Sequence, residues 1–310
     1  MSIRFTVLAS GSSGNASLLE VDGFGLLLDA GLGPRQLGSR MQAVGASWRH
    51  VHALLLTHTH GDHWHERTFT HLWRQRAPVY CHADHLAELQ QYSRSFGKLQ
   101  EIGLVRHYEP HVDMRLAPGV RCLPLPLRHD GAGTFGFRFE CSPEVDGLLF
   151  ALGYVADLGS WNHGLVAQLA DVDVLALEFN HDVELEQASD RSPQLIARVL
   201  GDHGHLSNAQ ATELLRAILG ASVPGRMQHV IQLHLSRECN RPDLAAQAVR
   251  AVLEGVAGQI QLHTACQDTP GPSIRIGVAG SEVRTAQVPR HLSPVPALTQ
   301  RWLPGVEAET

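Results

Sequence analysis

The chain has 310 residues, of which 44% are hydrophobic and 18% are charged, a composition typical of a globular protein with a full buried core. Its formal net charge is −6, so the whole-chain field argues against a broad basic face that grips nucleic acid, while local contacts remain open. No run of eighteen apolar residues occurs, so we expect no membrane span.

Short apolar runs separated by turn residues dominate the first half of the chain. They predict strands over residues 3–9, 17–21, 25–29, 51–56, 79–81, 120–125, 134–140 and 148–152. Two segments among them, 36–44 and 83–92, have the apolar period of helices.

Strands and helices alternate in the second half. Strands are expected over 172–178, 230–234 and 259–263, and helices over 193–200, 207–219 and 242–256. Ser207 and Gln210 have the spacing of a capping box, which starts a helix directly after His205 and Leu206. This order predicts one layered α/β domain with mixed sheets over residues 1–270. Pro and Gly become denser in 271–310, which we expect to be an extension with a loosely ordered end.

The cysteines and the first residues bear on the compartment. Five cysteines without close pairs argue against a disulfide framework and favour a reducing environment. The segment that begins Met-Ser-Ile-Arg-Phe lacks the basic, apolar and small-residue regions of a signal peptide. We therefore expect a cytoplasmic protein.

Four side chains that bind metals well lie within six positions, directly after an apolar strand: His58, His60, Asp62 and His63. A strand followed by a tight loop supports such side chains while their tips stay exposed. Three imidazoles and one carboxylate this close together are costly unless a cation lies between them. A histidine-rich surface turn is the alternative, but four donors at this spacing favour a metal site.

This His-x-His-x-Asp-His string resembles the signature of the metallo-β-lactamase superfamily, and further motifs follow in the same order. Asp29 closes an early strand in Leu-Leu-Leu-Asp, and His129 stands in Leu-Arg-His-Asp-Gly. Asp157 stands in Tyr-Val-Ala-Asp-Leu-Gly, and His234 ends a late strand. The resemblance implies a four-layer αββα sandwich with two mixed β-sheets.

The resemblance also implies a centre of two divalent metal ions, each held by three residues and sharing a bridging aspartate. One ion would be bound by His58, His60 and His129, the other by Asp62, His63 and His234, with Asp157 between them. Asp29 would support the loop by hydrogen bonds. Two such ions activate a bridging water, and we count Asp62 among the catalytic residues. Zinc suits this set best, with manganese or iron as alternatives.

Four local strings resemble the WalJ (YycJ)-like branch, a group of bacterial metal-dependent nucleases. They are Ala-Ser-Gly-Ser-Ser-Gly-Asn ending at Asn15, Leu-Glu-Phe-Asn-His-Asp from Leu177, Gly-His-Leu-Ser-Asn from Gly204, and His-Leu-Ser-Arg-Glu-Cys-Asn from His234. The last three are specific in combination, whereas the first alone is a weak Gly/Ser turn. Departures from the branch at Trp64, His65, Cys239 and Asn240 concern substrate contacts rather than metals.

These strings suit phosphodiester chemistry. A leaving alkoxide needs a proton, and His205, held by Glu178, is our candidate acid. The helix that begins at Ser207 directs free N–H groups toward the same place, which favours a phosphate. His203 is a rival donor, and residues 180–182 are either functional or a polar loop. We interpret His82 and His85 as helix-surface residues.

The leading hypothesis is a phosphodiesterase, most specifically a DNA exonuclease with DNA as its partner. A hydrolase of small esters, lactones or cyclic phosphodiesters is the alternative, supported by the net charge of −6. A metal-stabilised binding module is the third. The spacing leaves no room for the long arm of ribonuclease Z or the inserted domain of the ribonuclease J group. The short segment after His234 fits glyoxalase II poorly, and a secreted β-lactamase would need a signal peptide.

Overall fold

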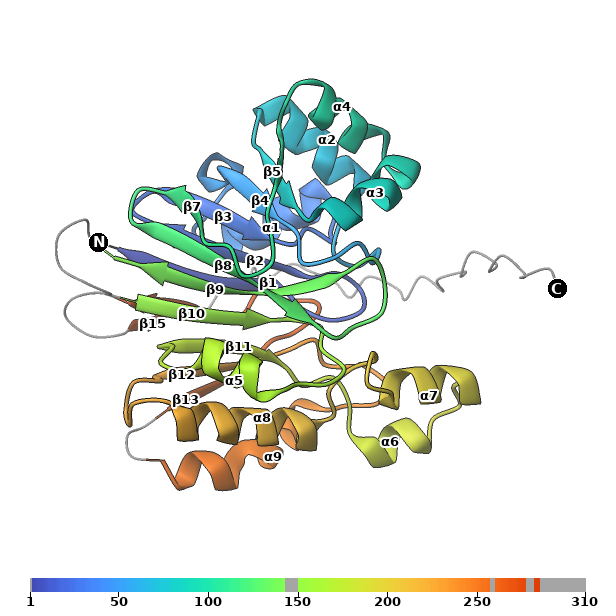
Figure 1. Cartoon of the computed structure of the whole chain (residues 1–310), viewed down its shortest axis with the longest axis vertical. Coiled ribbons are helices and arrows are strands. Elements are labelled where there is room, and N and C mark those ends of the chain that lie inside the picture. The colour runs from blue at the N-terminus through green and yellow to red at the C-terminus, as the bar shows by residue number, and fades with distance from the viewer. Residues whose placement is uncertain (1, 143–149, 257–259, 277–281, 285–310) are drawn as a thin grey trace.

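Two β-sheets pack face to face and carry helices on their outer faces in the computed structural model of the chain (Figure 1). The structure describes residues 2–142, 150–256, 260–276 and 282–284. The layers follow the order helices, sheet, sheet, helices, and both sheets are mixed. This confirms the predicted αββα sandwich.

The first sheet has the order β15-β14-β1-β2-β3-β4-β5-β6. Its pairs are antiparallel from β15 to β3 and parallel from β3 to β6. Its strands are β1 (Ile3–Ala9), β2 (Ala16–Val21), β3 (Phe24–Leu28), β4 (Ala53–Leu55), β5 (Val79–Cys81), β6 (Val105–His107), β14 (Ser273–Ile276) and β15 (Glu282–Arg284).

The second sheet has the order β13-β12-β11-β10-β9-β8-β7. Its four strands from β10 to β13 run parallel, and its remaining pairs are antiparallel. Its strands are β7 (Met114–Ala117), β8 (Val120–Leu127), β9 (Thr134–Cys141), β10 (Phe150–Val155), β11 (Val174–Glu178), β12 (His229–Leu233) and β13 (Gln261–Thr264).

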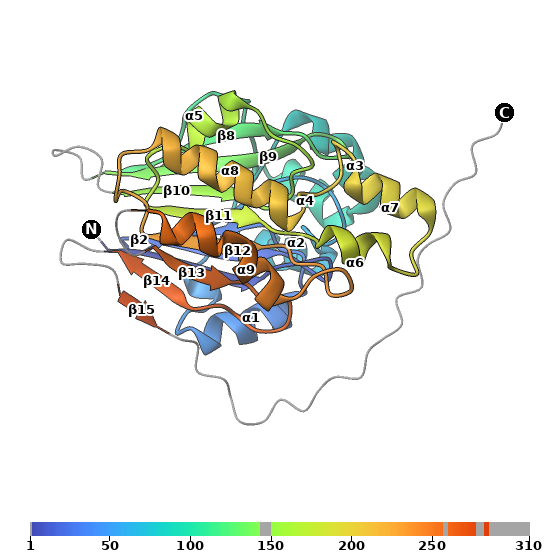
Figure 2. The same ribbon diagram turned by 90° about the horizontal axis from the view of Figure 1, so that it is seen from below.

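Helices cover both outer faces. The first sheet carries α1 (Pro34–Ala43), α2 (Glu66–Gln75), α3 (Leu86–Tyr92) and α4 (Arg94–Glu101), with 3-10 turns at Trp48–His50 and Ala83–His85. The second carries α5 (His163–Leu169), α8 (Asn208–Ala221) and α9 (Pro242–Glu254) (Figure 2). Two further helices, α6 (Val183–Gln187) and α7 (Pro193–Leu200), project beyond the sheets at the right of both views.

Side-chain alternation along the strands builds the core between the sheets. Phe135, Phe137 and Phe139 of β9 occupy alternate positions and all enter the cluster between the two sheets. The parallel strand β10 is buried on both faces, because helices also cover its other side. A continuous apolar run therefore marks the centre of the sheet.

Some elements were predicted with their bounds and others were missed. β1, β5 and α7 have the predicted bounds, whereas the helices α2, α4, α5 and α6 and the strands β6 and β7 were not expected. β14 and β15 lie in the segment 271–310 and add to the first sheet. Residues 148, 149 and 259 of the predicted strands, and the end of the chain from 285, lie outside the described residues. Among the helices of the described chain, none has the length and apolarity needed to cross a membrane.

Replacement of Phe137 by alanine tests the core between the sheets. Phe137 is fully buried among Tyr108, Phe139 and Cys122 in the same cluster, so the variant should lose about 3–5 kcal/mol of unfolding free energy. Urea titration of metal-loaded protein measures this loss. Phe24→Ala, at a partly buried position on the margin of that cluster, serves as the control. Equal losses in the two variants would contradict the assignment of the core.

Candidate metal centre

The predicted site residues gather where strands of both sheets end. His58 follows β4, His129 follows β8, and Asp157 follows β10. Glu178 ends β11, and His234 follows β12. Since the strands that precede these residues end at one edge, the two sheets bring ligands from distant parts of the chain together. Ligand sites of open α/β sheets lie at such carboxyl ends.

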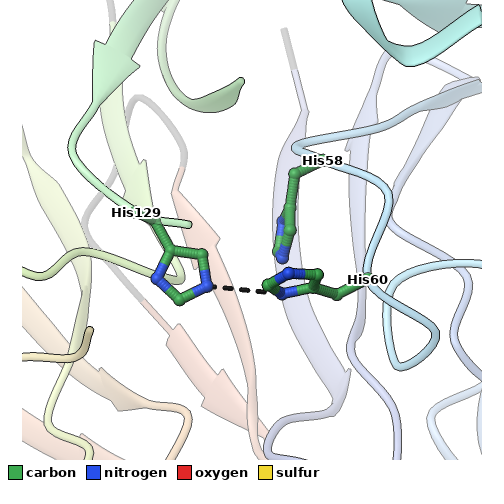
Figure 3. Close-up of side chains that lie close together, drawn as sticks. All are labelled: His58, His60 and His129. Atoms are coloured by element: carbon green, nitrogen blue, oxygen red, sulfur yellow. Dashed lines mark hydrogen bonds between the residues drawn. The ribbon is translucent and has the colours of Figure 1, made fainter. Parts of the chain in front are cut away.

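Three imidazoles form one half of the cluster (Figure 3). His58 and His60 come from the loop after β4, and His129 approaches from the second sheet. Nδ1 of His129 donates to the Gly204 carbonyl at 2.6 Å, and its Nε2 lies 3.4 Å from Nδ1 of His60. His58 is buried, and its Nε2 has no hydrogen-bond partner among the described residues. One ring nitrogen of each residue is thus directed at a common space.

Asp62, His63 and His234 form the other half. Nε2 of His234 lies 3.3 Å from Oδ2 of Asp62, and Nε2 of His63 lies 3.6 Å from the same oxygen. On its far side, Nδ1 of His63 donates to Asp29 at 2.8 Å. This bond leaves Nε2 of His63 to face the cluster, as the predicted supporting role of Asp29 requires.

Asp157 lies between the two halves. Its Oδ2 is 3.1 Å from Nε2 of His63, and its Oδ1 is 3.1 Å from Nδ1 of His234. Asp157 also groups with His58 and His63 at ligand spacing. Potential ligand atoms in each group lie within 4.8 Å of one another. The cluster therefore has the donor types and the spacing to hold divalent metal ions.

The protonation pattern supports this fit. Although burial opposes it, the surrounding carboxylates raise the pKa of His63 well above its usual value and that of His234 to about 10. Burial and the charge of His63 hold the pKa of His58 well below its usual value. The buried carboxylates thus require positive charge, which two imidazolium groups supply in place of a cation.

Backbone strain coincides with the predicted site. Asp29 and His234 have φ angles of 57° and 55°, in the left-handed region that residues other than glycine rarely adopt. Such conformations persist where the surroundings over-determine them, and they cluster at functional sites. Here the backbone N–H of His234 is held by the Ser10 hydroxyl at 2.8 Å.

Glu178 joins the predicted acid to this cluster. Its Oε1 accepts from Nδ1 of His205 at 2.7 Å and from Nδ1 of His234 at 3.0 Å. Its Oε2 accepts from the backbone N–H groups of Leu158 and Leu206. Glu178 is fully buried, whereas the side chain of His205 is 14% exposed. The carboxylate therefore orients His205 with its Nε2 available.

A second interpretation of His205 follows from spacing alone. His205, Glu178, Asp157 and His234 also lie close enough together to bind an ion. Both oxygens of Glu178, however, already accept two hydrogen bonds each. This saturation favours an orienting carboxylate over a metal ligand.

Other candidates from the sequence lie elsewhere. His203 is exposed, and its contact with this region, as far as the described residues show it, is made by its backbone carbonyl, which accepts from the N–H of Asp130. His85, which we expected on a helix surface, is fully buried and contacts the Gly133 carbonyl through Nε2, so that expectation was wrong. His65 accepts the Arg67 N–H at the start of α2, and Trp64 donates to the Thr59 carbonyl.

In the loop at residues 180–182, two of the three side chains make structural contacts. Asn180 donates to the His234 carbonyl at 3.0 Å, and Asp182 accepts from the Leu185 N–H at the start of α6. His181 is fully buried, with neither ring nitrogen paired among the described residues. Asn240 exchanges hydrogen bonds with Asn208 at the start of α8.

Two residues beside the cluster were missed from the sequence. The Thr57 hydroxyl lies within hydrogen-bonding distance of Asp29, His58 and His63. Nδ2 of Asn15 lies 3.0 Å from Oδ2 of Asp62 and 2.9 Å from Nε2 of His63. Asn15 ends the Gly/Ser string, and Thr57 directly precedes the metal loop. These two positions in the sequence are the signals from which a contact with the metal cluster could have been predicted.

The chain belongs to the beta-lactamase superfamily: the model of the beta-lactamase superfamily domain matches residues 25–224. This match spans strands and ligands from both sheets. It agrees with the fold and with the cluster of imidazoles and carboxylates at the carboxyl ends of the strands.

Individual relatives narrow the resemblance to one branch. The exodeoxyribonuclease WalJ of Streptococcus pneumoniae is 28% identical, over 88% of this chain and 98% of its own. The exodeoxyribonuclease YycJ of Bacillus anthracis is 26% identical, over 85% and 95%. The metallo-β-lactamase fold protein YhfI of Bacillus subtilis shares the fold, with a TM-score of 0.61, 17% identity and coverage of 87% and 99%. The predicted resemblance to the WalJ-like branch is confirmed.

Chelation combined with pH tests the electrostatics of the cluster. In the folded protein without metal, the pKa of His234 is raised to about 10, whereas a histidine in the unfolded chain has a pKa of about 6.5. The proton on His234 therefore stabilises the folded state fully below pH 6.5, and this stabilisation is lost as the pH rises through 10. The melting temperature of chelated protein should therefore fall more between pH 7 and pH 10 than that of metal-loaded protein, because ions replace those protons. If the melting temperatures of the two forms, measured by differential scanning fluorimetry, fell equally with pH, the proposal that metal ions replace the protons on His63 and His234 would be contradicted.

Proposed function

We propose that the protein is a dinuclear metal-dependent phosphodiesterase that acts as an exonuclease on DNA. The observation that carries this proposal is the Glu178 carboxylate, which connects the predicted proton donor His205 to the predicted ligand His234. The names of both relatives, exodeoxyribonucleases, support DNA as the substrate.

The cluster residues divide into two ligand sets. His58, His60 and His129 would hold one ion, Asp62, His63 and His234 the other, and Asp157 would contact both. Such ions lower the pKa of a water between them and offset charge on the phosphate. The abundance of imidazole favours zinc, with manganese or iron as alternatives.

The five free cysteines support a reducing, cytoplasmic environment.

His205 acts on the leaving group. Its Nδ1–H is held by Glu178, so its Nε2 can deliver a proton to the leaving sugar oxygen. The helix α8 begins at Asn208 with Ser207 as its cap. The N–H groups expected to be free are in part bonded, Asn208 to the His181 carbonyl and Gln210 to the Ser207 hydroxyl, so it is the positive end of the helix dipole that favours an anionic substrate. Asp62, whose side chain is 21% exposed, is the second carboxylate that we assign to catalysis.

A small-molecule ester, lactone or cyclic-phosphodiester hydrolase is the second candidate. The net charge of −6, which repels a polyanion, is the observation in its favour. Salt separates the two: binding of a nucleic acid weakens steeply with ionic strength, because phosphate contacts release counterions, whereas binding of a neutral lactone does not.

Replacement of His205 by alanine should affect substrates according to their leaving group. Cleavage of DNA, with a basic alkoxide to expel, should slow by about 10²–10⁴-fold. Hydrolysis of bis(p-nitrophenyl) phosphate should change little, because p-nitrophenolate leaves without a proton. Both rates are measured on the same metal-loaded preparations.

His203→Ala, at the exposed neighbouring histidine, is the matched control and should retain both activities. A wild-type protein that hydrolyses the aryl diester and lactones but no DNA would overturn the nuclease assignment. Equal losses on both substrates in the His205 variant would overturn the role assigned to His205 and would leave the nuclease assignment standing.

A further inference from the structure

The predicted metal cluster opens on the side of His60 and Asp130. Five of the predicted ligands are buried: His58, His63, His129, Asp157 and His234. The side chains of His60 and Asp130, in contrast, are 30% and 31% exposed. Asp62, the remaining predicted ligand, is 21% exposed, so His60 and Asp130 mark the most exposed side of the cluster, from which a polymeric substrate can reach the ions.

Asp130 connects an arginine to this opening. Its Oδ1 lies 3.2 Å from Nε2 of His129 and 3.5 Å from Nε2 of His60. Its Oδ2 accepts a hydrogen bond from Nε of Arg198, on the projecting helix α7. A single carboxylate thus separates the guanidinium of Arg198 from two imidazoles of the cluster.

The backbone of α7 places Arg198 against the segment that carries the predicted acid. The Val199 carbonyl accepts from the N–H of His205 at 3.0 Å. A Cβ atom at Gly204 would lie 2.1 Å from the Arg198 carbonyl oxygen, so only glycine permits this approach. The contacts that position His205 therefore also position Arg198.

The guanidinium retains its donors for a ligand. Only Nε of Arg198 is hydrogen-bonded within the described part of the chain, and its side chain is 49% exposed. An exposed ion pair by itself contributes little to stability. A guanidinium whose orientation is set by a carboxylate, and whose two outer amino groups have no hydrogen-bond partner among the described residues, suits a phosphate, which accepts two parallel hydrogen bonds.

We propose that Arg198 binds a backbone phosphate of the DNA strand at the open side of the metal cluster, with Asp130 holding its Nε. This inference rests on the proposed nuclease function and names a residue that positions the strand. In a chain of net charge −6, such a local contact supplies attraction that the overall field lacks.

The experiment compares Arg198→Gln with Arg216→Gln, which makes the same charge change. Arg216 is exposed on α8 and lines a groove between α8 and α9, two turns beyond the start of the helix. Binding of a fluorescein-labelled, phosphorothioate-linked single strand, which resists hydrolysis, is followed by anisotropy at several salt concentrations. Metal content and turnover of bis(p-nitrophenyl) phosphate are measured on the same samples.

Loss of one phosphate contact should reduce the slope of log affinity against log salt by about 0.7 and weaken binding about tenfold at low salt. Arg216→Gln should stay at wild-type values. Arg216→Gln should also keep the metal content and aryl-diester turnover of the wild type. Arg198→Gln should keep its metal content, because Arg198 is not a ligand, and its DNA binding is compared with that of the wild type at equal metal content.

If wild-type protein degrades DNA while Arg198→Gln binds it with unchanged slope and affinity, the inference is overturned and the nuclease function stands. The same holds if both arginine variants lose slope equally, because the effect is then general charge. If wild-type protein neither binds nor degrades DNA, the proposed function fails and the inference fails with it.

Discussion

One buried carboxylate determines how the site is assembled. Glu178, at the end of β11, is fully buried and accepts four hydrogen bonds. A charge in that position is tolerated only because all of these donors are present. They come from the segments after β10, before α8 and after β12. The same hydrogen bonds that stabilise the charge of Glu178 therefore hold the predicted acid His205 and the predicted ligand His234 in place, together with the chain segments that carry them.

Buried carboxylates that need positive partners also occur in the metal cluster, where they connect the two sheets. Asp29 and Asp157 are also buried carboxylates, and each is opposed by His63. Positive charge at the centre is therefore a requirement of the fold, supplied by protons in the chelated protein and by ions in the loaded one. Stability and metal binding are coupled in the chain, because the groups that need the charge also hold the sheets together at this edge.

Much of the fold and site could be predicted because the signals are local. The loop from His58 to His63 compresses four donors into six positions after an apolar strand, and strongly patterned segments such as β1 and α7 were predicted with their bounds. Other features depend on partners far away in sequence. The role of Asn15 comes from the contact with Asp62, that of Asp130 from Arg198, and the burial of His85 from Gly133. The short strand β14 is likewise set by its pairing with β1 rather than by its own pattern, whereas α2 has a local amphipathic pattern, with Thr68, Phe69 and Leu72 on its buried face, that was overlooked.

The most direct test of this account replaces Glu178 by glutamine and measures rate against the pKa of the leaving group across a series of aryl and alkyl phosphodiesters, together with metal content. If Glu178 orients both His205 and His234, the variant should bind less than the wild-type amount of metal. Its rate should also fall more steeply as the leaving group becomes more basic, because proton donation is impaired. Wild-type metal content and an unchanged dependence on the leaving group would contradict the central role of this carboxylate.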